Sequence, residues 1–237
     1  MVVAASLCVV AFAGCSMFTG VYEGDVFVET ADDISGLEGI TEITGNLVID
    51  GTSLTTLAGL EGLTKVAGDV AIGGDRGNGA LTSLDGLANL STIDGQLIVR
   101  KNPALPNLAG LAALTGTGDA FSVVENSLLS TLGPLPAFTR VGYFMNIERN
   151  QSLVDVGGIE NLVFVDFTLS IDSNVVLQNL AGFAGLREAG RLFVRDNIAL
   201  STCAAYALRD QLLAVNGMGR YDGLVDIARN LDDEPCE

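Results

Sequence analysis

The sequence predicts a mainly β fold, a right-handed β-solenoid of about 24-residue turns with parallel sheets and a helical, disulfide-clamped cap at its C-terminal end. Three observations lead to this fold class: a short apolar motif that recurs at a fixed interval, pairs of apolar residues two positions apart, and a column of asparagines. A fixed period of this length is typical of proteins that stack one structural unit per repeat. We therefore expect one elongated domain.

The period is visible in the motifs that begin successive turns. Five starts follow one another at one constant interval: Leu87, Leu111, Leu135, Ile159 and Phe183. Two earlier starts, Leu37 and Leu60, begin turns of unequal length, and the second and longer of these contains the glycine-rich stretch 73–79. These seven starts assign residues 37–203 to the solenoid repeats.

Within each turn, apolar residues occupy alternate positions, as in a strand that buries one face. The first inward column is predicted to be Val26, Leu47, Val70, Leu97, Phe121, Met145, Leu169, Leu192 and Val225. The second inward column lies two residues later and is predicted to be Val28, Ile49, Ile72, Val99, Val123, Ile147, Ile171, Val194 and Ile227. Stacked about 4.8 Å apart, these rungs predict a sheet roughly 38 Å long.

A column of asparagines follows the strands. Its members are Asn102, Asn126, Asn150, Asn174, Asn197 and Asn230, with Thr52 and Asp75 expected to replace asparagine in the early turns. Asparagine tolerates left-handed backbone, and its amide can bond both to the turn and to the next asparagine. We predict a structural ladder. Glycines near the turn ends, among them Gly86, Gly110 and Gly182, are expected to supply positive φ or a fixed corner.

The two ends are expected to differ from the repeats, because an uncapped solenoid exposes its core and its strand edges. Residues 25–36 are predicted to form an N-terminal half-turn, and residues 204–237 a cap. In the cap we expect a helix over 204–216, which buries Leu208, Leu212 and Val215 and ends at Gly217, and then a strand over 224–227. A disulfide between Cys203 and Cys236 is expected to clamp this end.

The N-terminal segment predicts export. Residues 2–14 are uncharged and apolar, which is typical of a signal-peptide core and short for a membrane span. The sequence that ends at Cys15 and Ser16 resembles a bacterial lipobox. This resemblance implies a signal peptide over 1–15, a lipid on Cys15, a tether over 16–24, and attachment to the cell envelope at the outer membrane. Ordinary secretion and a retained apolar helix are the alternatives.

Charge and composition exclude several classes of function. The chain has 29 acidic residues, 12 basic residues and no histidine, for a formal net charge of −17, which argues against a nucleic-acid partner. Without histidine, the usual general base and the commonest zinc ligand are missing. We assign no catalytic residue, cofactor or metal site. A β-helix carbohydrate-active enzyme using Asp50, Glu148 or Asp172, or calcium binding at 232–234, remains as an alternative.

Residues 95–110 read GQLIVRKNPALPNLAG. This pattern resembles the receptor L domain, the leucine-rich-repeat-like β-helix of the insulin and epidermal growth factor receptor ectodomains, which has bacterial and fungal surface relatives. The resemblance covers about residues 25–236 and implies an extracellular ligand-binding or adhesive module without enzymatic activity. Animal members carry cysteines at both ends, whereas only the C-terminal pair is present here. No partner specificity is therefore carried over.

The outward positions of the later rungs have the composition of protein interfaces, in which aromatic residues and arginines are enriched. The candidate residues are Phe144, Asn146, Glu148, Ser170, Asp172, Arg191, Phe193 and Arg195. The earlier rungs are expected to present no distinctive surface. We predict a binding face for a protein or glycan at the cell surface, the alternative being a structural envelope protein without a specific ligand.

Overall fold

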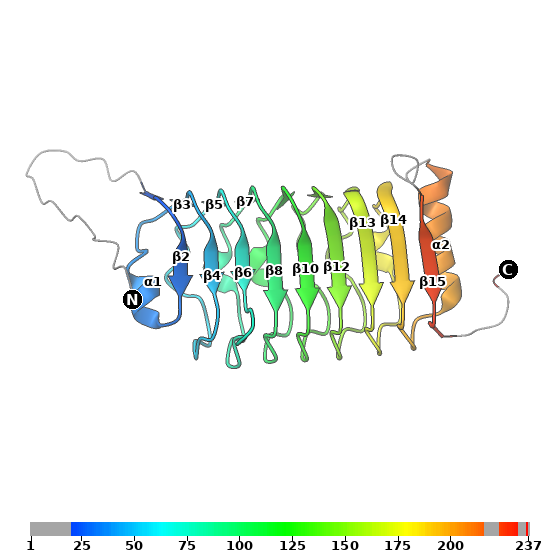
Figure 1. The fold of residues 1–237 in the computed structure, drawn as a ribbon, viewed down its shortest axis with the longest axis horizontal. Coiled ribbons are helices and arrows are strands. Elements are labelled where there is room, and N and C mark those ends of the chain that lie inside the picture. The colour runs from blue at the N-terminus through cyan, green and yellow to red at the C-terminus, as the bar shows by residue number, and fades with distance from the viewer. Residues whose placement is uncertain (1–19, 216–222, 232–235, 237) are drawn as a thin grey trace, which may run out of the picture.

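A computed structural model describes residues 20–215, 223–231 and 236, which form a β-solenoid of about seven turns with a parallel sheet (Figure 1). The strands are β1 (Val21–Tyr22), β2 (Val26–Val28), β3 (Glu42–Ile43), β4 (Leu47–Ile49), β5 (Lys65–Val66), β6 (Val70–Ile72), β7 (Thr92–Ile93), β8 (Leu97–Arg100), β9 (Gly116–Thr117), β10 (Phe121–Val124), β11 (Arg140–Val141), β12 (Phe144–Glu148), β13 (Phe164–Asp172), β14 (Glu188–Arg195) and β15 (Val225–Ala228). The helices are α1 (Ala31–Ser35), η1 (Asp85–Leu87), η2 (Ala109–Leu111), η3 (Ala181–Phe183) and α2 (Thr202–Ala214), where η marks a 3₁₀-helix.

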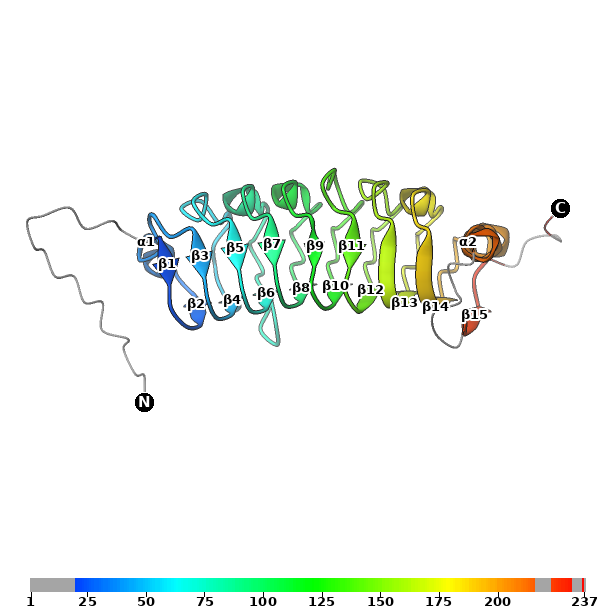
Figure 2. The same cartoon turned by 90° about the horizontal axis from the view of Figure 1, so that it is seen from above.

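Two ladders of strands run along the molecule and meet in β13. The main ladder contains the even-numbered strands β2 to β12 and faces the viewer in Figure 1. The second ladder contains the short odd-numbered strands β1 to β11, which are seen in Figure 2. β13 pairs with both β11 and β12, with a register shift between Val165 and Thr168, and β14 and β15 complete the main ladder. The corner that separates the two ladders is thus absorbed into one long strand.

Both predicted inward columns are confirmed. The pairing register places Leu97 beside Phe121 and Phe121 beside Met145, and the same register continues from β2 to β15. From β2 to β14 these side chains are buried, and in β15 Val225 and Ile227 are partly buried. Each fully buried aliphatic side chain stabilises the fold by about 1.5–3 kcal/mol. The two columns therefore form the axis of the core.

The predicted asparagine ladder is confirmed, and its bonds repeat from turn to turn. The Oδ1 atom of Asn126 accepts hydrogen bonds from the backbone N–H (3.0 Å) and the Nδ2 (3.1 Å) of Asn102. The Nδ2 of Asn126 in turn donates to the carbonyl oxygen of Val99 (2.9 Å). Asn126 is fully buried, so these bonds offset the cost of removing its amide from water.

In the turn where Asp75 was predicted to replace asparagine, the ladder residue is Asn78 instead. The Nδ2 of Asn78 donates to the Oδ1 of Asn102 at 3.0 Å, whereas Asp75 is exposed. The glycine-rich stretch 73–79 moves the ladder position three residues along the chain, so the constant offset on which the prediction relied does not hold in this turn. Thr52 holds the next rung as predicted and donates its N–H to Asn78, but its buried hydroxyl has no hydrogen-bond partner in the described structure.

The left-handed backbone lies one residue before each asparagine, and not at the asparagine as we expected. Residues with φ between 53° and 58° hold this position in six turns: Lys101, Glu125, Arg149, Ser173, Asp196 and Arg229. Gly51 and Gly77, with φ of 73° and 71°, hold it in the two turns before them. A non-glycine residue in this region costs on the order of 1 kcal/mol, and the asparagine bonds offset that cost.

The expected positive φ at the turn ends is confirmed at Gly59 (110°) and Gly158 (102°), but the glycines of the 3₁₀-helices are required for space instead. Gly86, Gly110 and Gly182 are absent from the residues with positive φ. A Cβ atom on Gly86 would lie 1.8 Å from the carbonyl oxygen of Leu57, and one on Gly182 would lie 1.9 Å from that of Val156. In these turns the preceding turn therefore approaches too closely for a side chain at the glycine.

The first turn begins earlier than predicted. Val21–Tyr22 falls in the range expected to be a tether, yet it forms β1 and pairs with β3. Residues 25–36 contain β2 and α1, and Thr30 caps α1 in a reciprocal arrangement with Asp33. The N–H of Glu29 and the Thr30 hydroxyl donate to the Asp33 carboxylate and hold its pKa below the ordinary value. Residues 1–19, and with them Cys15, lie outside the described residues.

The last turn carries the predicted helix and strand. The helix α2 begins at Thr202, slightly before the predicted start, and buries Leu208 and Leu212. Val215, which we expected to be buried, is 45% exposed because the helix ends at Ala214. The predicted cap residue Gly217 lies outside the described residues. β15 begins one position later than expected and pairs with β14 in parallel.

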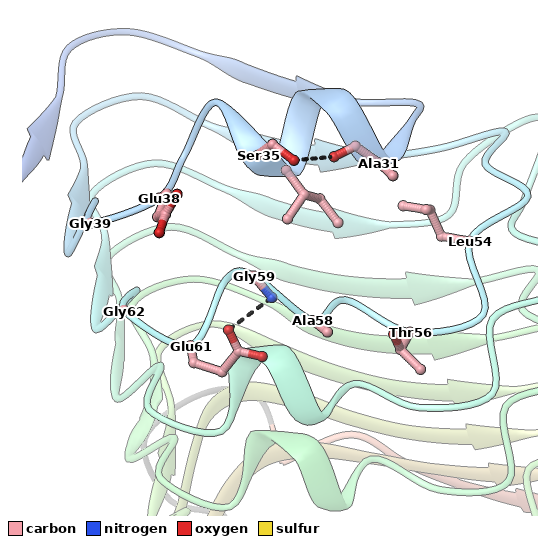
Figure 3. Close-up of a pocket in the computed structure, with 11 residues that line it drawn as sticks. Ala31, Ser35, Glu38, Gly39, Leu54, Thr56, Ala58, Gly59, Glu61 and Gly62 are labelled. Atoms are coloured by element: carbon pink, nitrogen blue, oxygen red, sulfur yellow. Dashed lines mark hydrogen bonds between the residues drawn. The ribbon is translucent and has the colours of Figure 1, made fainter.

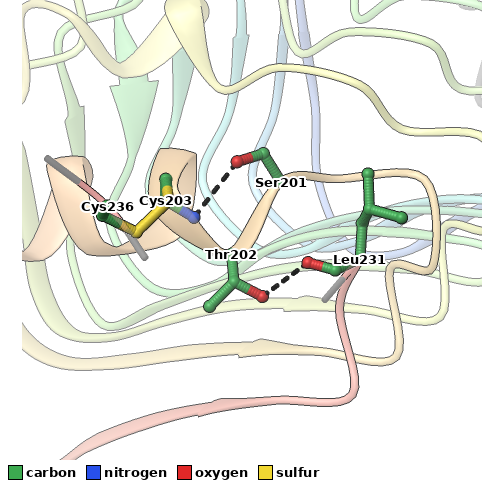
Figure 4. The surroundings of a disulfide bond; sticks show 5 residues. All are labelled: Ser201, Thr202, Cys203, Leu231 and Cys236. Carbon is green, nitrogen blue, oxygen red and sulfur yellow. Dashed lines mark hydrogen bonds between the residues drawn. A yellow bond between two sulfur atoms is a disulfide. The ribbon is translucent and has the colours of Figure 1, made fainter. Parts of the chain in front are cut away.

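The predicted disulfide between Cys203 and Cys236 is present (Figure 4). Its two Cα atoms are 5.3 Å apart, an ordinary separation for a disulfide. Nearby, the Ser201 hydroxyl accepts from the backbone N–H of Cys203 (3.1 Å), and the Thr202 hydroxyl donates to the carbonyl oxygen of Leu231 (2.8 Å). These contacts join the start of α2 to the end of the chain and hold β15 against the solenoid.

Candidate functional site

The structure brings the eight predicted face residues together on three neighbouring strands of the main ladder. The register places Phe144, Thr168 and Arg191 in one outward column. The next two outward columns contain Asn146, Ser170 and Phe193, and then Glu148, Asp172 and Arg195. All eight predicted residues are partly exposed, and Thr168 is buried at 9%. The face on β12, β13 and β14, which we call the late face, is therefore continuous.

Glu148, Asp172 and Arg195 of the late face form ion pairs with each other or with adjacent residues. The Arg195 guanidinium lies 3.3 Å from a carboxylate oxygen of Asp172 and 3.3 Å from one of Asp226, and it also covers the ring of Phe193 with its carbon 5.1 Å from the ring centre. Glu148 pairs with Arg149 at 2.7 Å. Partly exposed pairs of this kind contribute little to stability, about 0–1 kcal/mol each. Their main effect is to hold the side chains in one arrangement.

A further ion pair lies in the turn that follows β14. Arg229 donates two hydrogen bonds to the carboxylate of Asp196, in the turn that follows the late face. These bonds hold the pKa of Asp196 below its ordinary value and raise the pKa of Arg229. Both residues occupy left-handed positions before ladder asparagines. The Asp196–Arg229 ion pair therefore lies directly beside two successive rungs of the asparagine ladder.

Beside the late face lies a stack of planar groups that sequence reasoning missed. The rings of Tyr143 and Phe167 are parallel within 3°, with their centres 5.1 Å apart. The Arg191 guanidinium covers Phe167, with its carbon 4.5 Å from the ring centre. Phe144 meets the Tyr143 ring at 66° with a centre-to-centre distance of 5.5 Å. We call Tyr143, Phe167 and Arg191 the corner stack.

A displaced glycine makes room for the corner stack. In the early turns the corner residues are Gly45, Gly68 and Gly95, and a Cβ atom on Gly68 or Gly95 would lie 2.7 Å from a carbonyl oxygen of the preceding turn. In the later turns the crowded glycine stands one residue earlier, at Gly118 and Gly142, where a Cβ atom would lie 2.0 Å from a carbonyl oxygen. The next residue is then free to carry a side chain.

This signal was available in the sequence. Asp119, Tyr143 and Phe167 recur once per turn, in the column that holds glycine in the earlier turns. The alternation of inward and outward residues does not predict where a corner side chain points, because the chain bends there. The spacing alone would have identified the column, but not the stacking.

The early turns also differ from the prediction, since their surface is distinctive. Phe27 is 63% exposed, the largest exposed fraction among the large apolar residues of the described structure. It begins an outward column that continues through Val48, Ala71 and Ile98. The middle column of the early sheet is thus apolar, whereas in the next turns it holds Ser122, Asn146 and Ser170.

A cavity of about 500 Å³ lies between α1 and residues 54–62, away from the late face (Figure 3). Polar groups on its wall are bonded locally: Glu61 accepts from the N–H of Gly59 (2.8 Å), and the Ser35 hydroxyl donates to the carbonyl oxygen of Ala31 (3.1 Å). The remaining lining is made of small, apolar and acidic residues. We see no arrangement of a nucleophile and a base on this wall.

The three acids of the enzyme alternative are each held by an arginine. Asp50 lies 3.6 Å from Arg76 and also accepts from a backbone N–H, Glu148 pairs with Arg149, and Asp172 pairs with Arg195. Within the described residues, no group of three or more histidine, cysteine, aspartate or glutamate side chains could hold a metal ion. The same part of the chain contains no helix of the length and apolarity required to span a membrane.

No protein-family model, characterised protein or solved structure matches this chain.

Proposed function

We propose that this protein is a non-enzymatic, exported ligand-binding or adhesion module that presents the late face to a partner at the cell surface. The observation that carries the proposal is the register of β12, β13 and β14, which gathers aromatic, amide and charged side chains on one flat surface. Aromatic residues and arginines dominate binding energy at protein interfaces. The pairing of Arg195 with Asp172 and Asp226 fixes this surface before a partner arrives, which reduces the entropy lost on binding.

The second part of the proposal concerns where the protein is located in the cell. The apolar segment before Cys15 and its likeness to a lipobox support export and a lipid anchor in the cell envelope, at the outer membrane. Two or three acyl chains would hold the protein firmly, since each buried methylene contributes about 0.8 kcal/mol. Replacement Cys15→Ser tests this step: incorporation of labelled palmitate and recovery in the membrane fraction are both expected to be lost. Retention of the label would contradict lipidation at Cys15.

Binding is tested with a double substitution in the late face. Phe193→Ala with Arg195→Ala is expected to abolish the crosslinking of the protein to partners on intact cells. The matched control is Phe27→Ala with Arg76→Ala, which removes another exposed aromatic residue and another ion-paired arginine outside the face. Equal capture by the two variants would refute the late face as the binding site.

The two other functions have their own tests. A structural envelope role predicts that deletion weakens the envelope, and that the late-face variant restores the deletion strain fully. A carbohydrate-active enzyme predicts that the purified protein releases sugars from a panel of polysaccharides, and that substitution of Asp172 abolishes the release. The proposed module predicts neither result.

A further inference from the structure

The corner stack is closed at one end and open at the other. Arg191 covers one face of Phe167, and Tyr143 covers the opposite face. The outer face of Tyr143 points toward the preceding turn, and this residue is 45% exposed. We propose that the open end of the stack is a subsite for a cationic side chain, above all an arginine guanidinium, presented by a basic segment of a partner protein. The proposal rests on the proposed function, because it names the partner of the same surface.

The closed end shows which chemistry the stack accepts. A guanidinium is planar, weakly hydrated and able to lie flat on an aromatic ring, and Arg191 does so at 4.5 Å from the centre of Phe167. Tyrosine attracts cations through the same negative ring face. Several arginines of the described residues lie over aromatic rings, and none of them covers Tyr143. Apart from the stacked Phe167 and the tilted Phe144, no ring or guanidinium of the described residues lies against Tyr143, and its exposed part remains accessible to an external group.

A carboxylate that could pair with a bound guanidinium, that of Asp119, lies in the preceding turn. Asp119 is in register with Tyr143, because Thr117 pairs with Val141 and Phe121 pairs with Met145 on either side of it. Asp119 is exposed, and within the described structure its carboxylate makes no hydrogen bond or ion pair. A guanidinium lying on Tyr143 would approach this carboxylate and could form a charge-assisted hydrogen bond with it. The Tyr143 ring thus offers a guanidinium a surface to stack on, and Asp119 offers it a carboxylate to pair with.

The charge of the whole chain favours the same class of partner. With a formal net charge of −17, the protein attracts basic segments over long distances and repels polyanions. This long-range attraction is not specific by itself. The specific element is the juxtaposition of Tyr143 and Asp119 at the end of the stack.

The probe is a fluorescein-labelled hexa-arginine peptide, whose binding to the full-length protein is measured by fluorescence anisotropy at two salt concentrations. Tyr143→Ala and Asp119→Asn are each expected to raise the Kd about five- to thirtyfold. The matched controls are Phe27→Ala, another exposed aromatic residue, and Asp85→Asn, which makes the same change in net charge at another exposed acid. Both controls are expected to shift the Kd less than twofold, and Tyr143→Phe to retain binding.

Two further peptides, hexalysine and hexacitrulline, distinguish recognition of a guanidinium from recognition of positive charge or of side-chain shape alone. Hexalysine is expected to bind more weakly than hexa-arginine, and hexacitrulline, which has the shape of arginine without its charge, is expected not to bind. Equal effects of Asp119→Asn and Asp85→Asn, or equal binding of arginine and citrulline peptides, would overturn the subsite. So would preferential binding of chitosan, a cationic glycan. If crosslinking to cells depends on Phe193 and Arg195 while these peptide results fail, the subsite is wrong and the late face stands.

Discussion

The corner of the early turns and the corner of the late turns are built on the same core but end in opposite surfaces. At Gly45, Gly68 and Gly95 the preceding turn fills the space in which a side chain would stand. At Tyr143 and Phe167 the same column carries two stacked rings. In the turn of Tyr143 the crowded glycine has moved back by one residue, to Gly142, whereas in the turn of Phe167 that position holds Asp166. A solenoid can therefore gain an aromatic surface without any change in its interior.

The main sheet repeats this contrast. Its inward columns are apolar from the first turn to the last, whereas the middle outward column changes from Phe27 and Val48 to Asn146 and Ser170. Since inward residues are fixed by packing and outward residues are not, surface variation along the axis reports on function more directly than the core does.

The largest expected loss of stability comes from breaking the asparagine ladder between the early and the late turns. Asn126→Ala leaves the N–H of Asn102 and the carbonyl oxygen of Val99 without their partners in a buried site, and should lower the free energy of unfolding by about 3–5 kcal/mol. Urea unfolding followed by circular dichroism measures the loss, and hydrogen exchange should show the turns on either side losing protection. The control is Gln151→Ala, at the exposed position that follows the ladder asparagine of the next turn. Similar stability of the two variants would mean that the ladder does not couple the turns.

The second effect tests the corner directly. In Gly95→Ala the new Cβ atom would lie 2.2 Å from a carboxylate oxygen of Asp69 and 2.7 Å from the carbonyl oxygen of Gly68, and should cost about 2–3 kcal/mol. Asp119→Ala, at the same column one turn later, should change the free energy of unfolding by less than about 0.5 kcal/mol. Parallel urea titrations compare the two. If both substitutions cost the same, the displaced glycine does not explain the open corner.

A smaller effect is expected from the stack. Tyr143→Ala removes the parallel ring contact with Phe167 and the edge contact with Phe144, and should lower the free energy of unfolding by about 1 kcal/mol. Tyr143→Phe keeps both rings and should be neutral. Thermal unfolding at fixed pH distinguishes the two variants. A loss of stability in Tyr143→Phe would assign the contribution to the hydroxyl and not to stacking.

The smallest expected effect is a gain in stability from a substitution in the early turns. Thr52→Asn would place an amide in the rung that now holds a buried hydroxyl without a partner, within the pattern that Asn78 and Asn102 follow. The free energy of unfolding should rise by about 0.5–1 kcal/mol. Ser53→Asn, at the exposed position that follows, should leave stability unchanged. A decrease for Thr52→Asn would show that the first turns cannot accommodate the ladder geometry.

Much of the fold was predictable because the period is regular. The inward columns follow from an alternation of apolar positions that repeats once per turn, and Leu97, Phe121 and Met145 therefore fall into register as predicted. Asn78 was missed because the stretch 73–79 breaks the spacing on which the column depended. Val215 was misplaced because helical periodicity does not indicate where the helix ends.

The candidate site was only partly predictable for a related reason. Phe144 and Arg191 were placed on one surface, since both lie on regular strands. The stacking of Tyr143 on Phe167 depends on the backbone of the corner and on the clash at Gly142, which are set by the preceding turn and not by local sequence. Contacts between turns thus decide the parts of the site that strand alternation does not reach.

The asparagine ladder also bears on how such a molecule can grow. Each asparagine accepts from the turn before it and donates to the turn after it through the same atoms, so every interior turn offers its neighbours an identical pair of surfaces. A duplicated turn would enter between Asn126 and Asn150 with every amide satisfied. The number of turns can therefore change by whole units during evolution, while α1 at one end and α2 with its disulfide at the other stay the same.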